Sequence, residues 1–337
     1  MLQLHGLNLQ KLHLPLTDIL LMYHSPSVFD AQAEHSHAME HYDKLNTEQK
    51  HAIDTVLDAA YTDSHLRQTC FFLNGPAGTG KNFVYKTLIH TIRARGDIPI
   101  TVASTGIAAT LLPGGRTAHS VFKIPLKLTA TSTCNVKPIS QDVQHILQSK
   151  LIIWDEAPMT HAYAFQAVDR LLRVRHPFGR KTILLGGDFQ QILPVILHGS
   201  RALTVASCIN KQPLWRHMHV LTLTTNMRAL PDEQHFAKWL LEVGDGTNGT
   251  PVTLPSHCFP VHSDPIQQLY GDLDFSTVIF EQLSTRAILS VTNEDSLHLN
   301  EQVLKPIPTD EVTYTSVDSI VTDDPADRSN FISRRIS

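Results

Sequence analysis

The sequence has few cysteines, and their spacing fits neither a zinc site nor a disulfide framework. Its 337 residues include 4 cysteines, and none of them forms a Cys-x-x-Cys pair. They are Cys70, Cys134, Cys208 and Cys258. We therefore expect no structural zinc and no disulfide-stabilised secreted scaffold, and a reducing compartment suits the chain.

Long hydrophobic runs and targeting segments are also lacking. No stretch approaches the roughly 18 apolar residues of a membrane span. The opening residues MLQLHGLNLQ lack a basic segment followed by an apolar core, so we expect neither a membrane anchor nor a secretory signal. No dense basic targeting run, internal repeat or low-complexity tract is evident.

What the sequence does contain is enough apolar residues for a globular fold, together with an uneven distribution of charge. It is 42% hydrophobic and 18% charged, with a formal net charge of -4. Residues 61–230 carry 19 basic and 7 acidic residues, a net charge of +12, whereas residues 1–60 and 231–337 carry -5 and -11. The basic block indicates a polyanionic partner such as a nucleic acid. The alternative is a solvated surface neutralised by the acidic ends.

One stretch is rich in histidine. The segment HSHAMEH contains His35, His37 and His41, which could ligate a metal from a helix or a turn. No second group of ligands accompanies it, so we favour a polar linker.

A glycine-rich segment has the spacing of a phosphate-binding loop. GPAGTGK follows the apolar run at residues 70–73 and precedes an amphipathic stretch at residues 82–89. In such a loop the backbone N–H groups surround a polyphosphate and the lysine reaches its outer phosphates, while the following helix adds partial positive charge. We predict nucleotide binding rather than an ordinary glycine turn. The predicted contacts are Gly75, Pro76, Ala77, Gly78, Thr79, Gly80, Lys81 and Asn82.

Asn82 departs from the usual pattern. A serine or threonine normally stands there, and its hydroxyl binds the Mg²⁺ that bridges the outer phosphates. An amide oxygen can also ligate Mg²⁺, but it is larger and differently angled. We therefore expect nucleotide binding with slower hydrolysis.

Further short apolar runs predict an α/β fold with a parallel sheet covered by helices on both faces. We expect strands at residues 100–104, 151–154, 182–185 and 220–225, and a helix at residues 162–175. Strands that are apolar throughout are typical of a sheet buried on both sides.

Polar residues end these runs, where ligands collect in doubly wound sheets. Asp155 could hold Mg²⁺ through water and Glu156 could activate the attacking water, although this pair could instead cap a helix. Gln191 could sense the γ-phosphate, or form a polar turn. Arg228 could reach the transferred phosphoryl group, or remain a surface residue.

Together these motifs resemble the Pif-type (petite integration frequency) DNA helicases of superfamily one, especially the helicase portion of Helitron transposons. The resemblance covers roughly residues 44–320. It is carried by LNTEQKHAI, GPAGTGK, STGIAATLLPGGRTAHSVFKIP, WDEAPM, GGDFQQILPV and LTTNMR. It implies a RecA-like P-loop NTPase domain that uses ATP and Mg²⁺.

The resemblance also implies roles for individual residues. Gln49 would contact adenine, Lys81 the β/γ-phosphates, Asp155 and Asn82 the metal, Glu156 the hydrolytic water, Gln191 the γ-phosphate and Arg228 the transition state. Thr105, Gly106, Thr117 and His119 would line the path of single-stranded DNA. Phe122 either stacks on a base or belongs to the core.

Four regions follow from the family pattern. They are an N-terminal extension (1–44), a RecA-like ATPase domain (45–230, with a short insertion at about 123–149), a linker (231–283) and an incomplete second RecA-like domain (284–337). The opening of that second domain matches residues 287–300 and 314–320, with a strand expected at 287–291. Translocation needs two such domains that open and close over ATP. We therefore expect an incomplete gene product or a decayed transposon copy.

The resemblance implies an ATP-dependent helicase that moves 5′ to 3′ on single-stranded DNA and at forks, in repair, recombination, telomere maintenance or transposition. It also implies a nuclear location, and we expect a monomer. The alternative is a nucleotide-gated DNA-binding remnant without unwinding activity. A small-molecule kinase is disfavoured, because no lid for a phosphate acceptor is evident.

Overall fold

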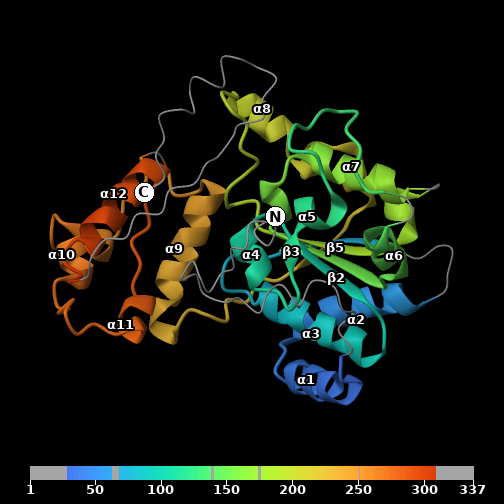
Figure 1. The fold of residues 1–337 in the computed structure, drawn as a ribbon, viewed down its shortest axis with the longest axis horizontal. Helices are drawn as coiled ribbons and strands as arrows, with labels where there is room; N and C mark the ends of the chain where they lie inside the picture. Colours follow the sequence, from blue (N-terminus) through green and yellow to red (C-terminus); the bar gives the residue numbers. More distant parts are fainter. Residues whose placement is uncertain (1–28, 63–67, 138–139, 174–175, 250, 309–337) are drawn as a thin grey trace, which may run out of the picture. The chain divides into compact units, whose positions relative to one another are not determined.

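The computed structural model describes residues 29–62, 68–137, 140–173, 176–249 and 251–308 (Figure 1). The chain divides into two compact units, residues 1–250 and 251–337. Each unit is described by itself below.

The first unit is built on a six-stranded sheet. Its strands are β1 (Cys70–Asn74), β2 (Pro99–Ala103), β3 (Arg116–Thr117), β4 (Leu151–Asp155), β5 (Thr182–Gly187) and β6 (His219–Thr222). They lie in the order β3-β2-β4-β5-β1-β6, and every neighbouring pair is parallel. This confirms the predicted parallel α/β sheet.

Helices cover both faces of the sheet, as Figure 1 shows. They include α2 (Thr47–Tyr61), α3 (Lys81–Ala94), α4 (Gly106–Thr110), α5 (Ala118–Phe122), α6 (Gln141–Gln148) and α7 (Ala162–Leu172). Two further helices of this unit, α8 (Arg201–Ala206) and α9 (Gln234–Asp245), contain no buried residue. Short 3₁₀ helices are η3 (Ala157–Met159), η4 (Pro177–Arg180), η5 (Ile209–Lys211), η6 (Pro213–His217) and η7 (Pro231–Glu233).

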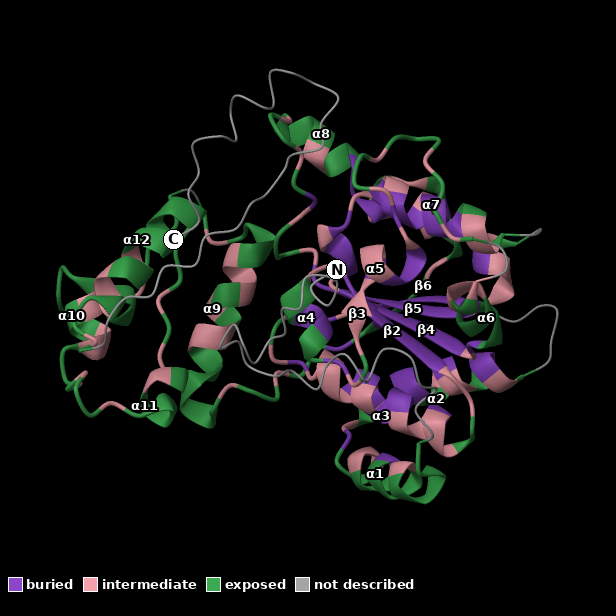
Figure 2. Ribbon diagram, viewed as in Figure 1, coloured by how far each residue is buried: buried purple, intermediate pink, exposed green. Residues whose placement is uncertain are grey.

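Alternate residues of β1, β4 and β5 enter two separate cores. In β4, Ile152 and Trp154 pack with α5, α6 and α7, whereas Leu151 and Ile153 pack with α2 and α3 on the opposite face. The period of two in a strand sends neighbouring side chains to opposite faces. Strands β1, β2, β4 and β5 are consequently buried on both sides and are purple in Figure 2, whereas β3 is half-buried and β6 is mostly exposed.

The histidine-rich segment is a helix, so the predicted polar linker is wrong. Helix α1 (Ala31–Asp43) packs against α3. Glu34 of α1 contacts the imidazole of His90 and lies 3.6 Å from the guanidinium of Arg93. Among the residues that the structure describes, no three His, Cys, Asp or Glu side chains form a group that could hold a metal ion.

The four cysteines are unpaired. Within the described ranges, no helix is long and apolar enough to cross a membrane.

The second unit consists of short helices and irregular chain in its described part. The helices are η8 (Ser256–Cys258), α10 (Pro265–Tyr270), α11 (Phe280–Ser284) and α12 (Asn293–Leu304). The strand predicted at residues 287–291 is wrong: no strand forms there, and Leu289 and Val291 are 94% and 100% exposed. An apolar run needs a partner strand to become part of a sheet, and the described part of this unit supplies none. Residues 314–320 lie outside the described residues.

The expected linker, residues 231–283, includes helices α9, α10 and α11. The chain passes from one compact unit to the other within it, at residue 250.

Candidate active site

The phosphate-loop sequence lies between β1 and α3, where the strand–loop–helix pattern predicts it. Gly78 and Gly80 have φ angles of 91° and 80°, a left-handed conformation that favours glycine. A side chain at either position would also collide with neighbouring atoms. A Cβ atom at Gly78 would lie 2.6 Å from Oδ1 of Asn226, and one at Gly80 would lie 2.5 Å from Nε2 of Gln49. The loop therefore requires both glycines.

Lys81 begins α3 and folds back over the loop. Its ammonium group donates to the carbonyl of Gly75 and lies 3.4 Å from the carbonyl of Pro76. Thr79 also donates to Pro76, at 2.9 Å. The loop thus holds its own lysine, which is the residue predicted to bind the outer phosphates.

Asp155 ends β4 and is only 3% exposed. Its Oδ1 atom is buried, and within the described part of the chain no group forms a hydrogen bond of standard geometry with it. Burial raises the pKa of this carboxyl, while the backbone N–H of Glu156, the nearby Tyr85 hydroxyl and the charge of Lys81 oppose the rise. An unpartnered buried carboxylate oxygen costs free energy unless another group binds it. The site therefore suits a hard cation such as Mg²⁺.

Glu156 follows in a conformation that is unusual for its residue type. Its φ and ψ angles are 54° and 37°, at the start of η3. A non-glycine residue in this region carries a strain of about 1–3 kcal/mol, and such strain is concentrated at functional sites. Burial raises the pKa of its carboxyl, the charges of Asp155 and Asp188 raise it further, and Lys81 lowers it. The charge of Lys81 thus acts on both acids. The strands that precede these residues, β1 and β4, lie on either side of β5, so the three predicted residues follow neighbouring parallel strands at the same end of the sheet.

Tyr85 is a member of this site that the sequence motifs do not reveal. It lies one turn into α3 and is completely buried. Its hydroxyl forms no hydrogen bond of standard geometry with the described residues, but it lies close enough to the Asp155 carboxylate to affect the pKa of that group. Its pKa is raised well above the usual value, first by burial and then by the charge of Asp155. A Cβ atom at Gly186 would lie 1.7 Å from this hydroxyl, so the glycine after the apolar run of β5 makes room for the tyrosine.

The neighbouring Gly187 also allows another element to pack closely against the end of β5. A Cβ atom there would lie 2.3 Å from Cδ of Pro158 in η3. The pair of glycines therefore lets α3 and η3 approach the end of β5 closely. The glycine pair is the signal in the sequence that could have indicated this close packing.

Gln191 lies beyond the end of β5, as expected. It is exposed, and its amide donates to Oδ2 of the buried Asp188 at 3.1 Å. The backbone N–H of Gln190 donates to the other carboxylate oxygen at 2.9 Å. Asp188 thus orients this turn, and the role of Gln191 as γ-phosphate sensor stays a prediction.

Gln49 lies directly beside the phosphate loop. It is 3% exposed, donates to the carbonyl of Thr79 at 3.0 Å and accepts from the backbone N–H of Asn46 at 3.1 Å. Both ends of its amide are therefore used within the protein. In this arrangement the side chain supports the loop, and these two bonds use one of its two N–H groups and one of its two oxygen lone pairs. The predicted adenine contact stays a prediction.

The segment after β6 also meets the loop. The backbone N–H of Met227 donates to the carbonyl of Gly78 at 2.8 Å. Asn226 accepts from the backbone N–H groups of Arg228 and Ala229 at 2.9 and 3.0 Å. This turn places Arg228 close in the chain to the loop, but its side chain is exposed, and its transition-state role stays a prediction.

The predicted DNA-lining residues follow two neighbouring strands at one edge of the sheet. Thr105 and Thr117 cap α4 and α5 with their hydroxyls, and Gly106 and His119 belong to those helices. Because β2 and β3 pair in parallel, with Ala103 opposite Thr117, these segments lie together. Their contact with DNA stays a prediction.

Phe122 requires a correction. It is completely buried and stacks on Trp154, with ring centroids 5.8 Å apart. A ring inside the core offers no face to a nucleobase. Phe122 therefore belongs to the core, which is the second of the two predicted alternatives.

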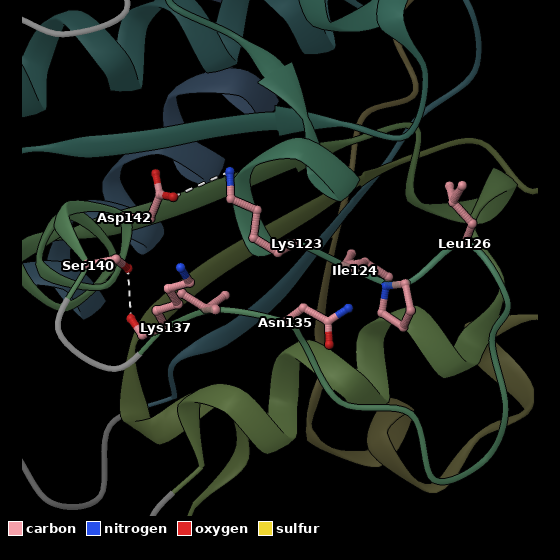
Figure 3. Close-up of a pocket in the computed structure, with 9 residues that line it drawn as sticks. Lys123, Ile124, Leu126, Asn135, Lys137, Ser140 and Asp142 are labelled. Carbon is pink, nitrogen blue, oxygen red and sulfur yellow. Dashed lines mark hydrogen bonds and ion pairs between the residues drawn. The ribbon is translucent and has the colours of Figure 1, made fainter. Parts of the chain in front are cut away.

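A pocket of about 540 Å³ lies away from these acids, in the predicted insertion (Figure 3). Lys123 forms an ion pair with Asp142 at 3.3 Å, and Ser140 donates to the carbonyl of Lys137 at 2.8 Å. We assign this pocket no part in the nucleotide site.

The arrangement as a whole fits phosphoryl chemistry. It combines a lysine on a glycine loop, a buried carboxylate with an unpartnered oxygen, and a second carboxylate beside it. Asp155 and Asn82 are the residues that would hold Mg²⁺. The metal would neutralise charge on the phosphates, and Glu156 is placed to accept a proton from water.

Known proteins are similar to this chain in sequence and in fold. The profile of the PIF1-like helicase family matches residues 44–253. The ATP-dependent DNA helicase Pif1 of Psychrobacter sp. (strain PRwf-1) is 35% identical over 153 residues, covering 44% of this chain and 22% of the relative. The ATP-dependent DNA helicase PIF1 of Xenopus laevis is 26% identical over 282 residues, covering 82% and 39%. The chain thus spans well under half of the length of these relatives.

Solved structures agree. Pif1 helicase from Bacteroides in complex with ADP-AlF3 and ssDNA is similar with a TM-score of 0.51 and 27% identity, over 60% of this chain and 47% of that one. Pif1 helicase from Candida albicans has a TM-score of 0.61 at 22% identity, over 86% and 61%, and supports the fold. Since the family profile covers more than half of the chain, the protein belongs to the PIF1-like helicase family.

Proposed function

We propose that this chain hydrolyses ATP in response to single-stranded DNA, as the ATPase part of a DNA helicase. The observation that carries the proposal is the meeting of Lys81, Asp155 and Glu156 at one edge of the sheet, with Oδ1 of Asp155 buried and unpartnered. The relatives named as ATP-dependent DNA helicases, and the Bacteroides structure with ADP-AlF3 and ssDNA, support the choice of ATP and DNA.

The residues of the site would divide the work. The loop N–H groups and Lys81 would bind the β- and γ-phosphates, so the lysine must exchange its loop carbonyl for phosphate oxygens. Asp155 and Asn82 would hold Mg²⁺, which supplies charge neutralisation. Glu156, whose pKa is raised, would take the proton of the attacking water.

The DNA partner is supported by the charge of the chain. Residues 61–230 carry a net charge of +12 and include the predicted DNA-lining segments at Thr105–Gly106 and Thr117–His119. Clustered Lys and Arg bind a phosphate backbone by releasing its counterions. We extend the proposal to 5′-to-3′ movement and forked substrates, and to a nuclear, monomeric protein in repair, recombination, telomere maintenance or transposition, on the family resemblance alone.

The test is phosphate release by the purified chain at saturating ATP and Mg²⁺, with and without a single-stranded oligonucleotide. We expect a rate increase of at least about tenfold with DNA, falling as salt rises, because counterion release weakens in salt. An equal rate with and without DNA contradicts the proposal. The same preparation with a 5′-tailed duplex tests unwinding.

One observation favours a second function, a nucleotide-gated DNA-binding remnant. Asn82 stands where the family pattern has a hydroxyl that binds Mg²⁺. For this second function we expect ATP to change the affinity of the chain for single-stranded DNA, and we expect DNA to leave the rate of ATP hydrolysis unchanged.

A further inference from the structure

Ser104 has no role assigned so far. It lies between the predicted DNA path and the turn that carries the two acids. It follows β2 directly, and it precedes Thr105 and Gly106 of the predicted DNA path. Its neighbour in the sheet is the end of β4, where the two acids lie, because β2 and β4 pair with Ala103 opposite Asp155. Ser104 is thus adjacent in the chain to the segment predicted to line the DNA path, and it also contacts the turn that carries the two acids.

The hydroxyl of Ser104 meets several groups of that turn. Its oxygen lies 2.6 Å from the carbonyl oxygen of Glu156 and 2.6 Å from the hydroxyl of Thr160, which donates to it. The indole N–H of Trp154 donates to it at 3.2 Å. The carbonyl of Asp155 lies farther away, at 3.3 Å, and already accepts from the backbone N–H of Ser104 at 3.1 Å.

These contacts account for the whole hydrogen-bonding capacity of a serine hydroxyl. It has one proton to donate and two lone pairs to accept with. Thr160 and Trp154 occupy the lone pairs, so the proton goes to the nearest remaining acceptor, the carbonyl of Glu156. The direction of the bond to Glu156 is therefore set by the two donors on the other side of the oxygen.

The bond acts on a residue in an unfavourable backbone conformation. Glu156 has a φ angle of 54°, which a non-glycine residue keeps only when its surroundings hold it there. Its carbonyl accepts from Met159 within the same turn at 3.1 Å and from Ser104 across the sheet. Ser104 is thus the contact that fixes this strained carbonyl to the rigid sheet.

We propose that Ser104 is a positioning residue for Glu156: its hydroxyl holds the backbone of the acid in the left-handed conformation that aims the carboxylate at the attacking water. This inference rests on the proposed function. It places Ser104 in the hydrolysis step alone, because the loop and Lys81 bind ATP without contact with it. Loss of the hydroxyl should therefore lower kcat and leave the KM for ATP unchanged.

The experiment compares Ser104→Ala with the wild-type full chain in DNA-stimulated ATP hydrolysis. We expect kcat to fall about tenfold, as a misaligned general base would cause, with KM for ATP within about twofold of the wild-type value. Ser104→Thr keeps the hydroxyl and should retain at least about half of kcat. Thr160→Val removes one donor to Ser104 but leaves the bond to Glu156, and should lower kcat by less than about threefold.

The outcomes separate this inference from the proposed function. A wild-type chain that hydrolyses no ATP contradicts the proposed function and the inference with it. A hydrolysing wild type with Ser104→Ala at the same kcat, or with Ser104→Thr as impaired as Ser104→Ala, contradicts the inference alone. Thermal unfolding establishes that each variant folds. If Ser104→Ala does not, Ser104→Cys, which has a similar shape and only a weak donor, replaces it with the same expected results.

Discussion

At the scale of single residues, the site contains an acidic side chain in a buried position, where a charged group is unfavourable. Asp155 is buried with an unpartnered oxygen, and burial raises its pKa above the ordinary 3.8. Folding therefore disfavours its charged form. In its ionised form the carboxylate therefore lowers the stability of the folded chain.

A substitution can measure this penalty. Asp155→Asn should raise the midpoint of thermal unfolding at pH 7 without Mg²⁺, because it removes a buried charge. The raised pKa makes the folded state bind a proton more tightly, so the penalty exists above the unfolded pKa. The gain should shrink as the pH falls from the raised folded pKa through 3.8, and it should vanish below 3.8, where Asp155 is protonated in both states. A variant that is less stable than the parent at pH 7 would refute the assignment.

Asn82 carries the second residue-scale prediction. Asn82→Thr restores the hydroxyl that the family pattern uses for Mg²⁺, and it should raise the ATP turnover by about threefold to tenfold. Steady-state phosphate release from the purified pair of proteins measures this. The neighbouring Lys86→Thr, on the same helix but beyond the loop, is the matched control and should leave turnover unchanged. An unchanged rate in Asn82→Thr would show that the amide is an adequate ligand.

Several residue roles could be predicted from the sequence, and others could not. The phosphate loop and the acids after β4 follow from spacing, because their chemistry requires fixed residue types at fixed positions. The burial of Phe122 and the hydrogen-bonded amide of Gln49 depend on neighbours far away in the chain. Tyr85 looks like any apolar-face residue of α3 until the position of Gly186 is known.

At the scale of elements, one carboxylate ties the helix before the phosphate loop to the segment after β6. Glu48 of α2 accepts from the backbone N–H groups of Thr224 and Thr225 at 2.8 and 3.2 Å, and from the Thr224 hydroxyl. The bonds from Thr224 come first among the causes that lower the pKa of Glu48. The carboxylate thus joins segments 176 residues apart.

Replacing this carboxylate should loosen the connection. Glu48→Gln should lower the free energy of unfolding by about 1 kcal/mol at pH 7, because hydrogen bonds to a charged acceptor become neutral ones. Since the folded pKa is lowered, the stabilisation is present above the ordinary value of 4.5 and is lost as the pH falls through the lower folded pKa. Urea unfolding at pH 7 and at acidic pH measures both effects.

Glu40→Gln is the matched control. Glu40 forms an exposed ion pair with Lys44, and its side chain is 60% exposed. Exposed pairs contribute little, so this variant should unfold at the same urea concentration as the parent. Equal losses in the two variants would contradict the role given to Glu48.

The elements themselves were predictable where the apolar pattern is strong. Strands β1, β2, β4 and β5 coincide with predicted runs, because strands buried on both faces are apolar throughout. Strand β6 overlaps a predicted run as well, although it is mostly exposed. Strand β3 has only two residues and no pattern to reveal it. Helix α1 is polar on most sides and is held by its contacts with α3, which the sequence alone does not display.

At the scale of the whole molecule, the chain combines one complete nucleotide-binding unit with a second unit of short helices. The first unit contains both hydrophobic cores and every predicted site residue. The second unit, in its described part, forms no strand.

This division predicts that residues 1–250 fold without the rest. The fragment should unfold cooperatively with a midpoint within about 5 °C of that of the full chain, because its core is complete. Circular dichroism during heating measures this. A fragment that lacks a cooperative transition would show that residues 251–337 are needed to complete the fold.

The central claim is that Lys81 and the two acids form one triphosphate pocket. Calorimetric titration of the full chain with ATP and Mg²⁺, beside Lys81→Ala, tests it most directly. We predict saturable binding to the parent and an affinity reduced at least about a hundredfold in the variant, since the lysine contacts the outer phosphates. Equal affinity of the two proteins for ATP would contradict the claim.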